Sequence, residues 1–596
     1  MGFDYWLVHL IWTLPPATLL TAAYWPFFTR LEITKILILI NIAVLSTIPW
    51  DSYLIRNRIW SYPADAVVGH KLFEIPFEEI FFFIIQTYCT SLLYVILTKH
   101  LVLPAYLLPR KGNFTKAIGS AILMAGTGIG IIFTSSKNHL TYLGLILVWA
   151  LPVLAFQWLL CGNFLLALPK RPILLSILLP TFYLWIVDSL SLQRGTWVIE
   201  RGTKVDIQLW GSLDLEEAVF FLVTNVMVVL GLVTVDHALA MAEYDMVMTK
   251  PADSHQSSIA QIFWSYMTSQ WRSFDVRFLE GLNAAIEKLS QKSQSMYLGS
   301  AMFQDRLRID LVLLYSFCRV IDDLVDEAPD SKTAQANIKE ASQVLQWRFS
   351  TKRPTKPLYE YLEVENGPEQ TSALTPLLSS IALLPASRLT LKPLLELLSG
   401  FEMDLGFSAE KQEFPITTES DLQLYAHRVA GTVASSLLEL VFSHYGMDEN
   451  KYDRAQQERI INSGQCMGQA LQYVNIARDI KRDAAISRVY IPSSWLAEEG
   501  ITPTDVLASP DDDKLAIFED RMLRKANDAY EQSVGAIDEL PKEARGPIKT
   551  TIESYMMIGG MVRKRRQAGI KEEGKLKVPL WRRLRLAWWE MSVSHS

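Results

Sequence analysis

Two glutamate pairs stand at the start of long hydrophobic runs in the first half of the chain. Glu78 and Glu79 lie in PFEEIFFFIIQ (76–86), and Glu216 and Glu217 lie in DLEEAVFFLVTN (214–225). A carboxyl group at the edge of an apolar span is costly, and therefore it usually has a function. A carboxylic acid that holds a proton beside aromatic faces, which stabilise cations, suits proton-initiated olefin chemistry. We interpret these four glutamates as candidate acids and bases.

Each glutamate pair belongs to a longer repeated pattern. Asp51 stands nine positions before Trp60, and Asp188 stands nine positions before Trp197; the two copies lie about 138 residues apart. In each copy we expect a span to end at the aspartate and the next span to begin at Glu-Glu. The acids would then gather at one membrane face, between the two halves of a duplication. The simpler alternative is that they are solvated helix ends, favoured by the helix dipole.

Two acidic motifs mark the second half of the chain. They are VIDDLVDE (320–327), with Asp322, Asp323 and Asp326, and VNIARDIKRD (474–483), with Asn475, Asp479 and Asp483. Spacing of four residues places side chains on one face of a helix. Carboxylates are ligands that Mg²⁺ or Mn²⁺ accepts while it bridges to phosphates, so the five aspartates are candidate metal ligands. Arg319, Arg478 and Arg488 lie nearby in sequence and could bind phosphate oxygens.

The elements that must position these residues form two domains. The chain has 596 residues, a net charge of -6 and four scattered cysteines, and half of its residues are hydrophobic. No basic field for nucleic acid is present. Apolar runs long enough to cross a membrane lie near 5–23, 31–49, 77–97, 117–134, 140–160, 172–187 and 217–236. The sequence therefore predicts an all-α protein with about seven transmembrane helices and an internal duplication, followed by a domain of soluble helices.

We expect a membrane domain at 1–240, with repeats at about 1–110 and 140–240, a linker at 241–270 and a second domain at 271–596. The stretch 328–375 is polar and is punctuated by Pro and Gly, which is typical of a long insertion or mobile loop. The tail KVPLWRRLRLAWWEMSVSHS (577–596) is basic and rich in tryptophan. It is expected either to lie on a membrane surface or to pack as a terminal helix.

The second half resembles the phytoene synthases of the squalene/phytoene synthase family. The matching segments are KSQSMY (292–297), YSFCRVIDDLVDE (315–327), GFEMDL (400–405), YAHRVAGTV (425–433) and QYVNIARDIKRDAAISRVYIP (472–492). The resemblance implies an all-α isoprenoid synthase fold and magnesium-dependent, head-to-head condensation of two geranylgeranyl diphosphates through a cyclopropyl intermediate. It also implies site residues: Ser293, Ser295, Tyr297 and Arg306 at the first diphosphate, and Tyr425, Gln472 and Asn475 in the second half of the site. Met296 and Arg482 depart from the family pattern, which commonly has Phe and an acid there.

The first half resembles the membrane-bound lycopene cyclases, and the whole chain resembles the fungal family in which such a cyclase is fused to a phytoene synthase. The resemblance rests on the repeated Glu-Glu and Phe-Phe blocks; Asp214 replaces the proline seen as Pro76 in the first copy. It implies that one glutamate protonates the terminal double bond of lycopene or a related acyclic carotene. Ring closure and loss of a proton then give β-rings. We expect an endomembrane, such as the endoplasmic reticulum, with the synthase in the cytosol, because the second half needs cytosolic substrate and magnesium.

Other functions remain open at this point. The membrane half could be an anchor or a carotenoid-holding module, and the second half could be a squalene-type synthase that uses a nicotinamide cofactor. A transporter with a regulatory domain fits the twin acidic motifs poorly. A retinal protein is disfavoured because no lysine lies between Glu216 and Asp236 in the last span.

Overall fold

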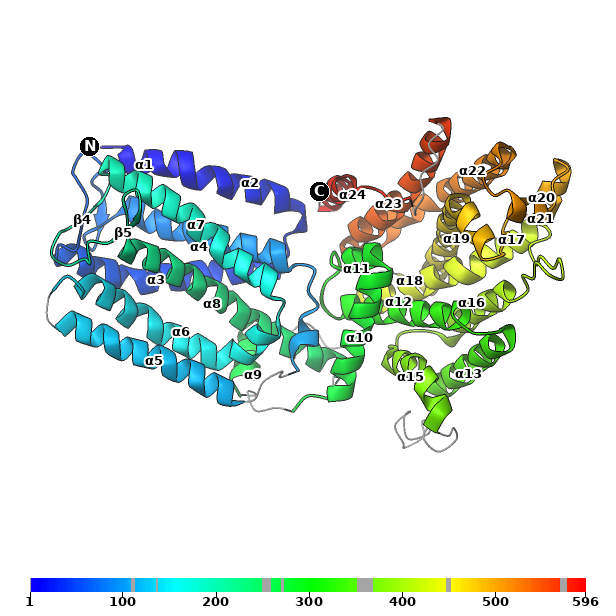
Figure 1. Cartoon of the computed structure of the whole chain (residues 1–596), viewed down its shortest axis with the longest axis horizontal. Coiled ribbons are helices and arrows are strands. Elements are labelled where there is room, and N and C mark those ends of the chain that lie inside the picture. The colour runs from blue at the N-terminus through cyan, green and yellow to red at the C-terminus, as the bar shows by residue number, and fades with distance from the viewer. Residues whose placement is uncertain are drawn as a thin grey trace. The chain divides into compact units, whose positions relative to one another are not determined.

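The computed structural model describes residues 2–108, 113–135, 138–248, 259–268, 273–350, 368–445, 452–568 and 576–595. Within them the chain is almost entirely helical, and its strands are two or three residues long. It divides into two compact units, one formed by the described residues up to Leu279 and the other by those from Glu280 onward (Figure 1). The expectation of an all-α protein is confirmed.

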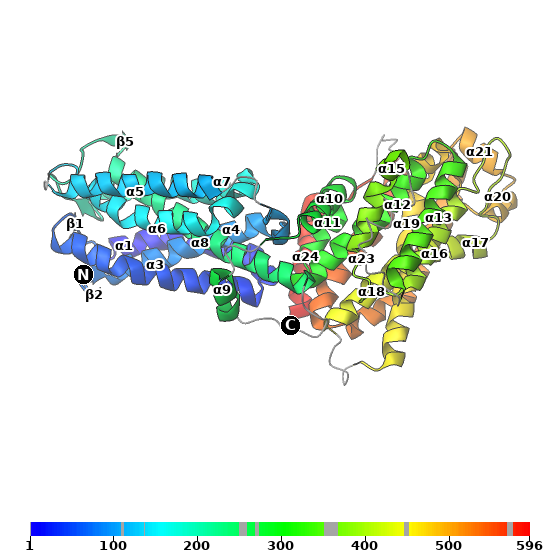
Figure 2. The ribbon, with the colours of Figure 1, turned by 90° about the horizontal axis from the view of Figure 1, so that it is seen from below.

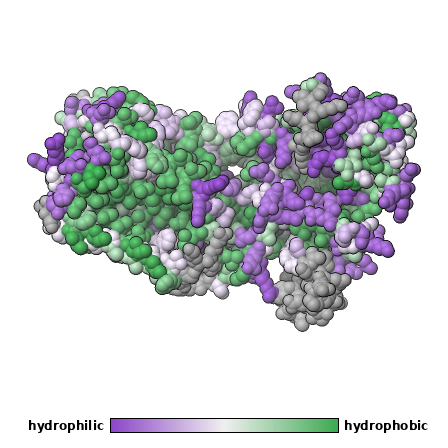
Figure 3. Space-filling view, in the orientation of Figure 1, coloured by the Kyte–Doolittle hydropathy of each residue, from purple (hydrophilic) through white to green (hydrophobic). Residues whose placement is uncertain are grey.

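The first unit is built from helices that are long and apolar enough to cross a membrane; seven are found among the described residues. The first span, Asp4–Phe27, combines α1 (Asp4–Val8), η1 (His9–Thr13), α2 (Leu14–Tyr24) and η2 (Trp25–Phe27). The others are α3 (Arg30–Arg56), α4 (Phe77–Thr98), α5 (Asn113–Ser135), α6 (Thr141–Ala167), α7 (Lys170–Arg194) and α8 (Leu215–Met248). Hydrophobic residues cover the visible flank of this unit (Figure 3). The predicted seven spans are therefore confirmed, and the chain is a membrane protein.

Short strands connect the helices that carry the repeated acids. They are β1 (Trp60–Ser61), β2 (Lys71–Leu72) and β3 (Ile75–Pro76) between α3 and α4, and β4 (Val198–Ile199), β5 (Gln208–Trp210) and β6 (Leu213–Asp214) between α7 and α8. The pairs β2–β3 and β5–β6 are hairpins, whereas β1 pairs antiparallel with β4 and sets Trp60 opposite Ile199. Both views show the strands at one end of the helices (Figures 1 and 2). The two connections therefore meet directly.

The helices that begin at the glutamate pairs also contact each other through polar side chains. Gln86 Nε2 donates to Oγ1 of Thr224 at 3.1 Å, and the hydroxyl of Thr90 donates to Oδ1 of Asn225 at 2.7 Å. All four side chains are buried. Because buried polar groups are costly when unpaired, these bonds fix the register of α4 against α8.

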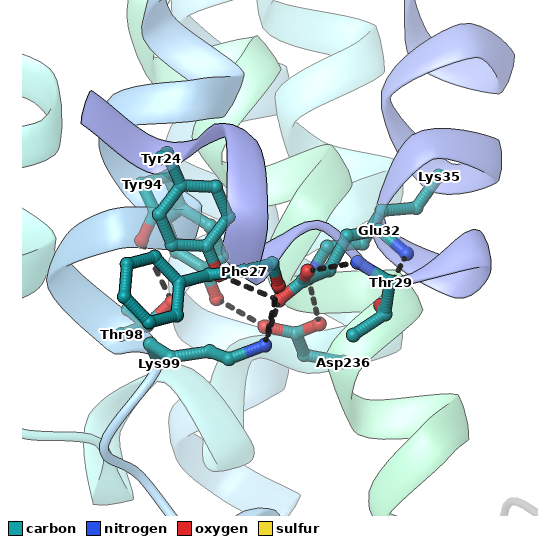
Figure 4. Close-up of polar contacts among 9 residues, drawn as sticks. All are labelled: Tyr24, Phe27, Thr29, Glu32, Lys35, Tyr94, Thr98, Lys99 and Asp236. Atoms are coloured by element: carbon teal, nitrogen blue, oxygen red, sulfur yellow. Dashed lines mark hydrogen bonds and ion pairs between the residues drawn. The ribbon is translucent and has the colours of Figure 1, made fainter. Parts of the chain in front are cut away.

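A network of charged side chains lies toward the other ends of these helices (Figure 4). Lys35 Nζ is 2.9 Å from Oδ1 of Asp236, and Oδ2 of Asp236 accepts the phenol of Tyr94 at 2.7 Å. Lys99 Nζ is 2.9 Å from Oε1 of Glu32, which also forms a capping box with the Thr29 residue before α3. Two positive and two negative charges thus balance within an apolar bundle and join α3, α4 and α8.

Two further helical segments complete the first unit: η3 (Leu103–Tyr106) follows α4, and α9 (Ile259–Thr268) follows α8 along the chain. The phenol of Tyr266 in α9 donates to the carbonyl oxygen of Leu160 at 2.9 Å and lies 3.0 Å from Nδ1 of His237. These contacts hold α9 against α6 and α8.

The second unit is a set of helices around an apolar core. Its elements are α10 (Val276–Lys292, which begins in the first unit), α11 (Gln294–Ser300), α12 (Asp305–Asp326), α13 (Ser331–Phe349), α15 (Pro368–Leu383), α16 (Leu391–Asp404), α17 (Glu419–Ala426), η4 (His427–Gly431), α18 (Thr432–Tyr445), α19 (Arg454–Ala485), α20 (Ser493–Glu498), α21 (Pro503–Ala508), η5 (Asp513–Leu515), α22 (Ala516–Ser533), η6 (Val534–Glu539), α23 (Lys542–Gln567) and α24 (Leu580–His595). The loop expected at 328–375 is wrong at both ends, because α13 occupies Ser331–Phe349 and α15 begins at Pro368. α13 places Ile338, Ala341 and Leu345 in the core, and residues 351–367 lie outside the described part of the chain.

Candidate active sites

The second glutamate of each pair is held by tyrosine hydroxyl groups inside the membrane unit. Oη of Tyr5 donates to Oε2 of Glu79 at 2.5 Å, and Oη of Tyr62 donates to the same oxygen at 2.7 Å. In the other copy, Oη of Tyr142 donates to Oε1 of Glu217 at 2.7 Å. Both glutamates are buried. Glu79 therefore has two phenol donors, whereas Glu217 has one among the described residues.

The first glutamate of each pair is bound to the connection that precedes its helix. Oε1 of Glu78 accepts the backbone N–H of Val68 at 2.9 Å, and Oε1 of Glu216 accepts the backbone N–H of Val205 at 2.6 Å. The second oxygen of each, Oε2, is buried and has no hydrogen-bond partner within the described residues. These glutamates thus brace the two connections, each with one oxygen left for another group.

The two aspartates of the repeat lie inside their helices. The expectation that each span ends at its aspartate is wrong, because α3 continues to Arg56 and α7 to Arg194. Indole Nε1 of Trp197 donates to Oδ1 of Asp188 at 3.0 Å. Asp51 interacts electrostatically with Glu79 and Glu217. Acids from both copies are therefore grouped in one buried region.

Aromatic rings lie one turn into α4 and α8 from these acids. Ring centroids are 6.0 Å apart for Phe82 and Phe221, 6.5 Å for Phe83 and Phe220, and 5.4 Å for Phe220 and Phe221. Trp60 packs edge-on against Phe220 at 5.9 Å. Carboxyl groups beside such faces can transfer protons while the rings stabilise a developing carbocation.

Sequence reasoning missed the tyrosines of this region. Tyr5 and Tyr142 stand 137 positions apart, nearly the spacing of the glutamates that they contact. A search for all residue types that recur at this spacing would have found them. Asp214, which departs from the repeat, forms an ion pair at 2.6 Å with Lys204, so its charge is balanced locally.

The second unit contains a cavity of about 790 Å³. Carboxylates from three helices line it: Asp322 and Asp326 from α12, Asp404 from α16, and Asp479 and Asp483 from α19. Beyond them its walls are apolar, and the lining residues there include Val433, Leu437, Leu438, Ile460, Met467, Ile537, Leu540, Ile548 and Ile552. The cavity can therefore hold a molecule with an anionic head and a long hydrocarbon tail.

Arg488 links the acidic groups. Its Nη2 is 2.7 Å from Oδ1 of Asp326, and its Nη1 is 4.0 Å from Oδ2 of Asp404. Asp404 also accepts the phenol of Tyr490 at 2.7 Å. Burial raises the pKa of Asp404 to about 6, although Arg488 opposes this. The arginine therefore offsets part of the repulsion among carboxylates that share one space.

Two other carboxyl groups of the cavity hold protons more readily than usual. Burial raises the pKa of Asp322 to about 6, against the opposing charge of Arg319. Burial together with the charge of Asp479 raises the pKa of Asp483 to about 7. A cation placed among these groups would stabilise their ionised forms.

The donor set fits Mg²⁺ or Mn²⁺. The carboxylates of Asp322, Asp326, Asp479 and Asp483 supply the hard oxygen ligands that these ions prefer. Within the described residues no three His, Cys, Asp or Glu side chains already converge on one point. Mg²⁺ is usually held by one or two carboxylates together with substrate phosphates, so the arrangement suits ions that bind with a diphosphate.

The cavity brings most of the predicted synthase residues together. Besides the four aspartates, those that line it are Ser293, Arg319, Tyr425, Gln472, Asn475, Arg478 and Arg488. Sequence reasoning missed Tyr490, Tyr315 and Tyr555, which also line it. Tyr315 stands seven positions before Asp322 on the same face of α12, so the helical spacing of the acidic motif could have found it. The positions of Tyr490 and Tyr555 depend on how distant segments pack, which no spacing in the sequence reports.

Four predicted residues lie in the described part of the second unit but do not line the cavity. Asp323 faces α10, where its Oδ2 is 2.5 Å from Nζ of Lys288. Arg306 pairs with Asp310 one turn on, at 3.6 Å. Ser295 accepts a hydrogen bond from Arg583 at 2.9 Å, and Tyr297 is buried but does not line the cavity.

Seven apolar spans, followed by a helical unit whose cavity joins a carboxylate-lined part to an apolar interior, define a membrane protein with a site for an amphiphilic anion. Residues 289–582 match the squalene/phytoene synthase family. The chain is 51% identical to the bifunctional lycopene cyclase/phytoene synthase of Arthroderma gypseum, across 99% of this chain and 100% of that protein. It is 44% identical to the protein of the same name from Aspergillus oryzae, with the same shares covered.

The chain belongs to the family of bifunctional lycopene cyclase/phytoene synthases. A solved structure of a dehydrosqualene synthase is also similar to it, at 21% identity and a TM-score of 0.42, covering 53% of this chain and 97% of that one.

Proposed function

We propose that the two units carry two successive activities of carotenoid biosynthesis: the second unit is a phytoene synthase, and the membrane unit is a lycopene β-cyclase. The observation that carries the proposal is the pairing of two unlike sites in one chain. One is a cavity with a carboxylate-lined part and an apolar interior. The other is a buried set of duplicated acids beside aromatic rings.

In the synthase, two geranylgeranyl diphosphates condense head to head. Loss of one diphosphate and one proton gives the cyclopropyl intermediate prephytoene diphosphate, and loss of the second diphosphate and a second proton gives phytoene. Arg319, Arg478 and Arg488 would bind the diphosphate oxygens, with Asn475 and Gln472 beside them. The apolar walls hold the hydrocarbon tails and exclude water from the carbocations.

Mg²⁺ or Mn²⁺ held by Asp322, Asp326, Asp479 and Asp483 would neutralise the leaving diphosphate. Tyr425 and Tyr490 both line the cavity, and their rings stack with centroids 4.8 Å apart. Their faces can stabilise the allylic cation that ionisation leaves behind.

In the cyclase, a carboxylic acid protonates the terminal double bond of lycopene. The next double bond attacks the resulting tertiary cation and closes a six-membered ring, and a base removes a proton to form the β-ring. We assign Glu217 as the acid and Glu79 as the base. Glu79 accepts two phenol hydrogen bonds, which stabilise a carboxylate more than a carboxylic acid, whereas Glu217 accepts one among the described residues. Asp51 and Asp188 support them, and Glu78 and Glu216 brace the connections.

Membranes that contain the full chain test this proposal. We expect lycopene, supplied without a nucleotide cofactor, to be converted to γ- or β-carotene, as chromatography of the pigments would show. Geranylgeranyl diphosphate with Mg²⁺ should give phytoene from the same membranes. Phytoene with unchanged lycopene would contradict the cyclase assignment and leave a synthase on a membrane anchor. Squalene-type reduction by a nicotinamide cofactor would contradict the synthase assignment.

The proposal includes an orientation in the membrane. Prenyl diphosphates and Mg²⁺ are supplied in the cytosol, so the synthase faces the cytosol from the endoplasmic reticulum or another endomembrane. An odd number of spans then places the amino terminus on the opposite side. An acceptor site for N-glycosylation added at the amino terminus should be glycosylated, and the same site added after Ser594 should not.

A further inference from the structure

The carboxy-terminal helix α24 has one side packed against the second unit. Ala587, Glu590 and Met591 are buried there, and Glu590 pairs with Lys549 of α23 at 3.2 Å. A Cβ atom at Gly546 of α23 would approach Sδ of Met591 to 2.8 Å, so this glycine permits the close contact. α24 is therefore anchored to the unit rather than loosely attached.

Another face of α24 is apolar and exposed. Trp581, Leu584 and Trp588 follow the i, i+3, i+7 spacing of one helical face, and they are 60%, 56% and 38% exposed. Trp589 beside them is 61% exposed. A cluster of large exposed apolar side chains on a packed helix marks an interaction surface. Tryptophan is the residue type that is enriched where protein meets the boundary between lipid and water.

The flanks of this face are positively charged. Arg582 and Arg585 are exposed, and the guanidinium of Arg582 lies 5.1 Å from the ring of Trp581. Arg583 is turned toward α11, where it donates to Ser295. Apolar side chains bordered by arginines match an anionic leaflet, in which the side chains enter the acyl boundary and the arginines meet the headgroups.

The helix also touches the wall of the cavity from outside. It packs on α23, which lines the cavity with Thr551, Ile552 and Tyr555, and Arg583 binds α11, which lines it with Met296 and Gly299. A surface that holds α24 would thus adjoin two of the helices that line the cavity.

We propose that α24 is an interfacial helix that seats the second unit on an anionic lipid surface through Trp581, Leu584 and Trp588. The bilayer is available because the same chain contains seven spans. The contact is separate from the spans, and it keeps the unit on the membrane when the covalent link between the units is cut.

A cleavable full chain tests the proposal. A protease site is inserted within residues 269–272, so that α9 stays with the membrane unit after cleavage. The chain is reconstituted into vesicles of phosphatidylcholine with about 30% phosphatidylserine, an anionic lipid that attracts basic segments, and the link is cut. We expect the released synthase unit to sediment with the vesicles. Trp581→Ser/Leu584→Ser/Trp588→Ser should lower its bound-to-free ratio by roughly tenfold or more. Arg582→Glu/Arg585→Glu should lower it on the anionic vesicles and not on pure phosphatidylcholine.

The matched control is Leu424→Ser/Ile517→Ser, which removes exposed apolar side chains of the same unit outside α24. It should sediment like the unaltered unit. Synthase activity after cleavage confirms that each variant is folded. An active, unaltered unit that stays in the supernatant would overturn the proposal. So would a triple variant that sediments as well as the control, or a released unit that elutes as a dimer through α24.

Discussion

Tyr5 and Tyr142 make the same contact in the two halves of the membrane unit. Each donates its phenol to the second glutamate of a Glu-Glu pair, Tyr5 to Glu79 at 2.5 Å and Tyr142 to Glu217 at 2.7 Å. Only Glu79 is also bound by Tyr62, at 2.7 Å. The duplicated site is therefore symmetric in its framework and asymmetric in its hydrogen bonding, and this difference underlies the proposed division into acid and base.

The tyrosines can be tested one by one. Tyr142→Phe removes the phenol bound to Glu217, and we expect lycopene cyclisation to slow by about 10-fold or more, the scale of one hydrogen bond to a charged or reacting group. Tyr62→Phe leaves Tyr5 on Glu79 and should have a smaller effect. Initial rates of β-ring formation measure both, and unchanged phytoene synthesis is the control. Equal rates in the two variants would contradict the asymmetry.

The glutamates should differ in their products as well as in their rates. Glu217→Gln removes the proposed acid, so lycopene should remain unchanged. Glu79→Gln removes the proposed base, and the ring cation can then lose a proton from another carbon. We expect slow turnover with a larger share of ε- or γ-rings, identified by chromatography and mass spectrometry. Isomeric rings from Glu217→Gln and none from Glu79→Gln would reverse the assignment.

The two neighbouring aspartates of DDxxD should differ sharply. Asp322 lines the cavity, whereas Asp323 faces Lys288. Asp322→Asn should slow phytoene synthesis on the order of 100-fold, as the loss of one electrostatic group in an active site does. It should also raise the Mg²⁺ concentration required for half-maximal rate. Asp323→Asn should retain most activity and lose heat stability. A chelator should abolish phytoene synthesis in the unaltered chain and leave lycopene cyclisation intact. Loss of cyclisation on chelation would contradict the assignment of the two activities to separate sites.

The buried pair of Lys35 and Asp236 should matter for stability. Lys35→Met leaves the carboxylate of Asp236 with Tyr94 as its one side-chain partner among the described residues, and an uncompensated buried charge typically costs about 3–5 kcal/mol. The melting temperature in nanodiscs should fall accordingly. Lys35→Met/Asp236→Leu removes both charges and should recover part of the loss. The losses of stability in Lys35→Met and in Asp236→Leu are added for comparison. If the double variant loses more stability than that sum, the pair does not act as a charge-balanced unit.

The synthase unit should lose stability in mild acid through His444. Its Nε2 lies 2.6 Å from Nη1 of Arg388 and 3.1 Å from Oδ2 of Asp310, with Arg306 nearby. Burial lowers the pKa of His444 below its ordinary value of 6.5. The unfolded chain therefore binds a proton first, and the stability that His444 contributes is present above pH 6.5 and declines as the pH falls below it.

Heat inactivation of synthase activity, followed from pH 7.5 to 5.5, measures this effect (a range of about one unit on each side of the free imidazole value). His444→Gln should show a smaller fall in its inactivation midpoint than the unaltered chain. An equal fall in both would mean that other groups cause it.

Much of the architecture could be predicted because membrane spans and acidic helix faces leave strong local patterns. The start of α4 and of α8 at the glutamate pairs follows from composition alone. The burial of Asp51 inside α3 did not follow from composition. Hydropathy falls at Asp51 in either case, whether a helix ends there or buries the acid. α13 was missed for a similar reason: its polar residues hide the few that pack inward, such as Ile338 and Leu345.

The chemistry of the sites was predicted in part. Motif spacing selected Asp322 and Asp326 as neighbours on one helix face, and both line the cavity. The family pattern also selected Arg306, whose partner Asp310 lies on its own helix, and neither side chain lines the cavity. Tyr490 lies far from Asp404 in the sequence and contacts it only after the helices pack. Contacts of this kind can be identified only once the fold is known.

The direct pairing of β1 with β4 bears on how the cyclase could be divided. Trp60 opposite Ile199, together with the bonds from Gln86 to Thr224 and from Thr90 to Asn225, links the halves without passing through the chain between η3 and α5. If the chain were divided between η3 and α5, the two fragments would still contain the residues of every one of these contacts. Fragment complementation of the membrane unit is thus built into its fold, and a two-subunit cyclase requires no new interface.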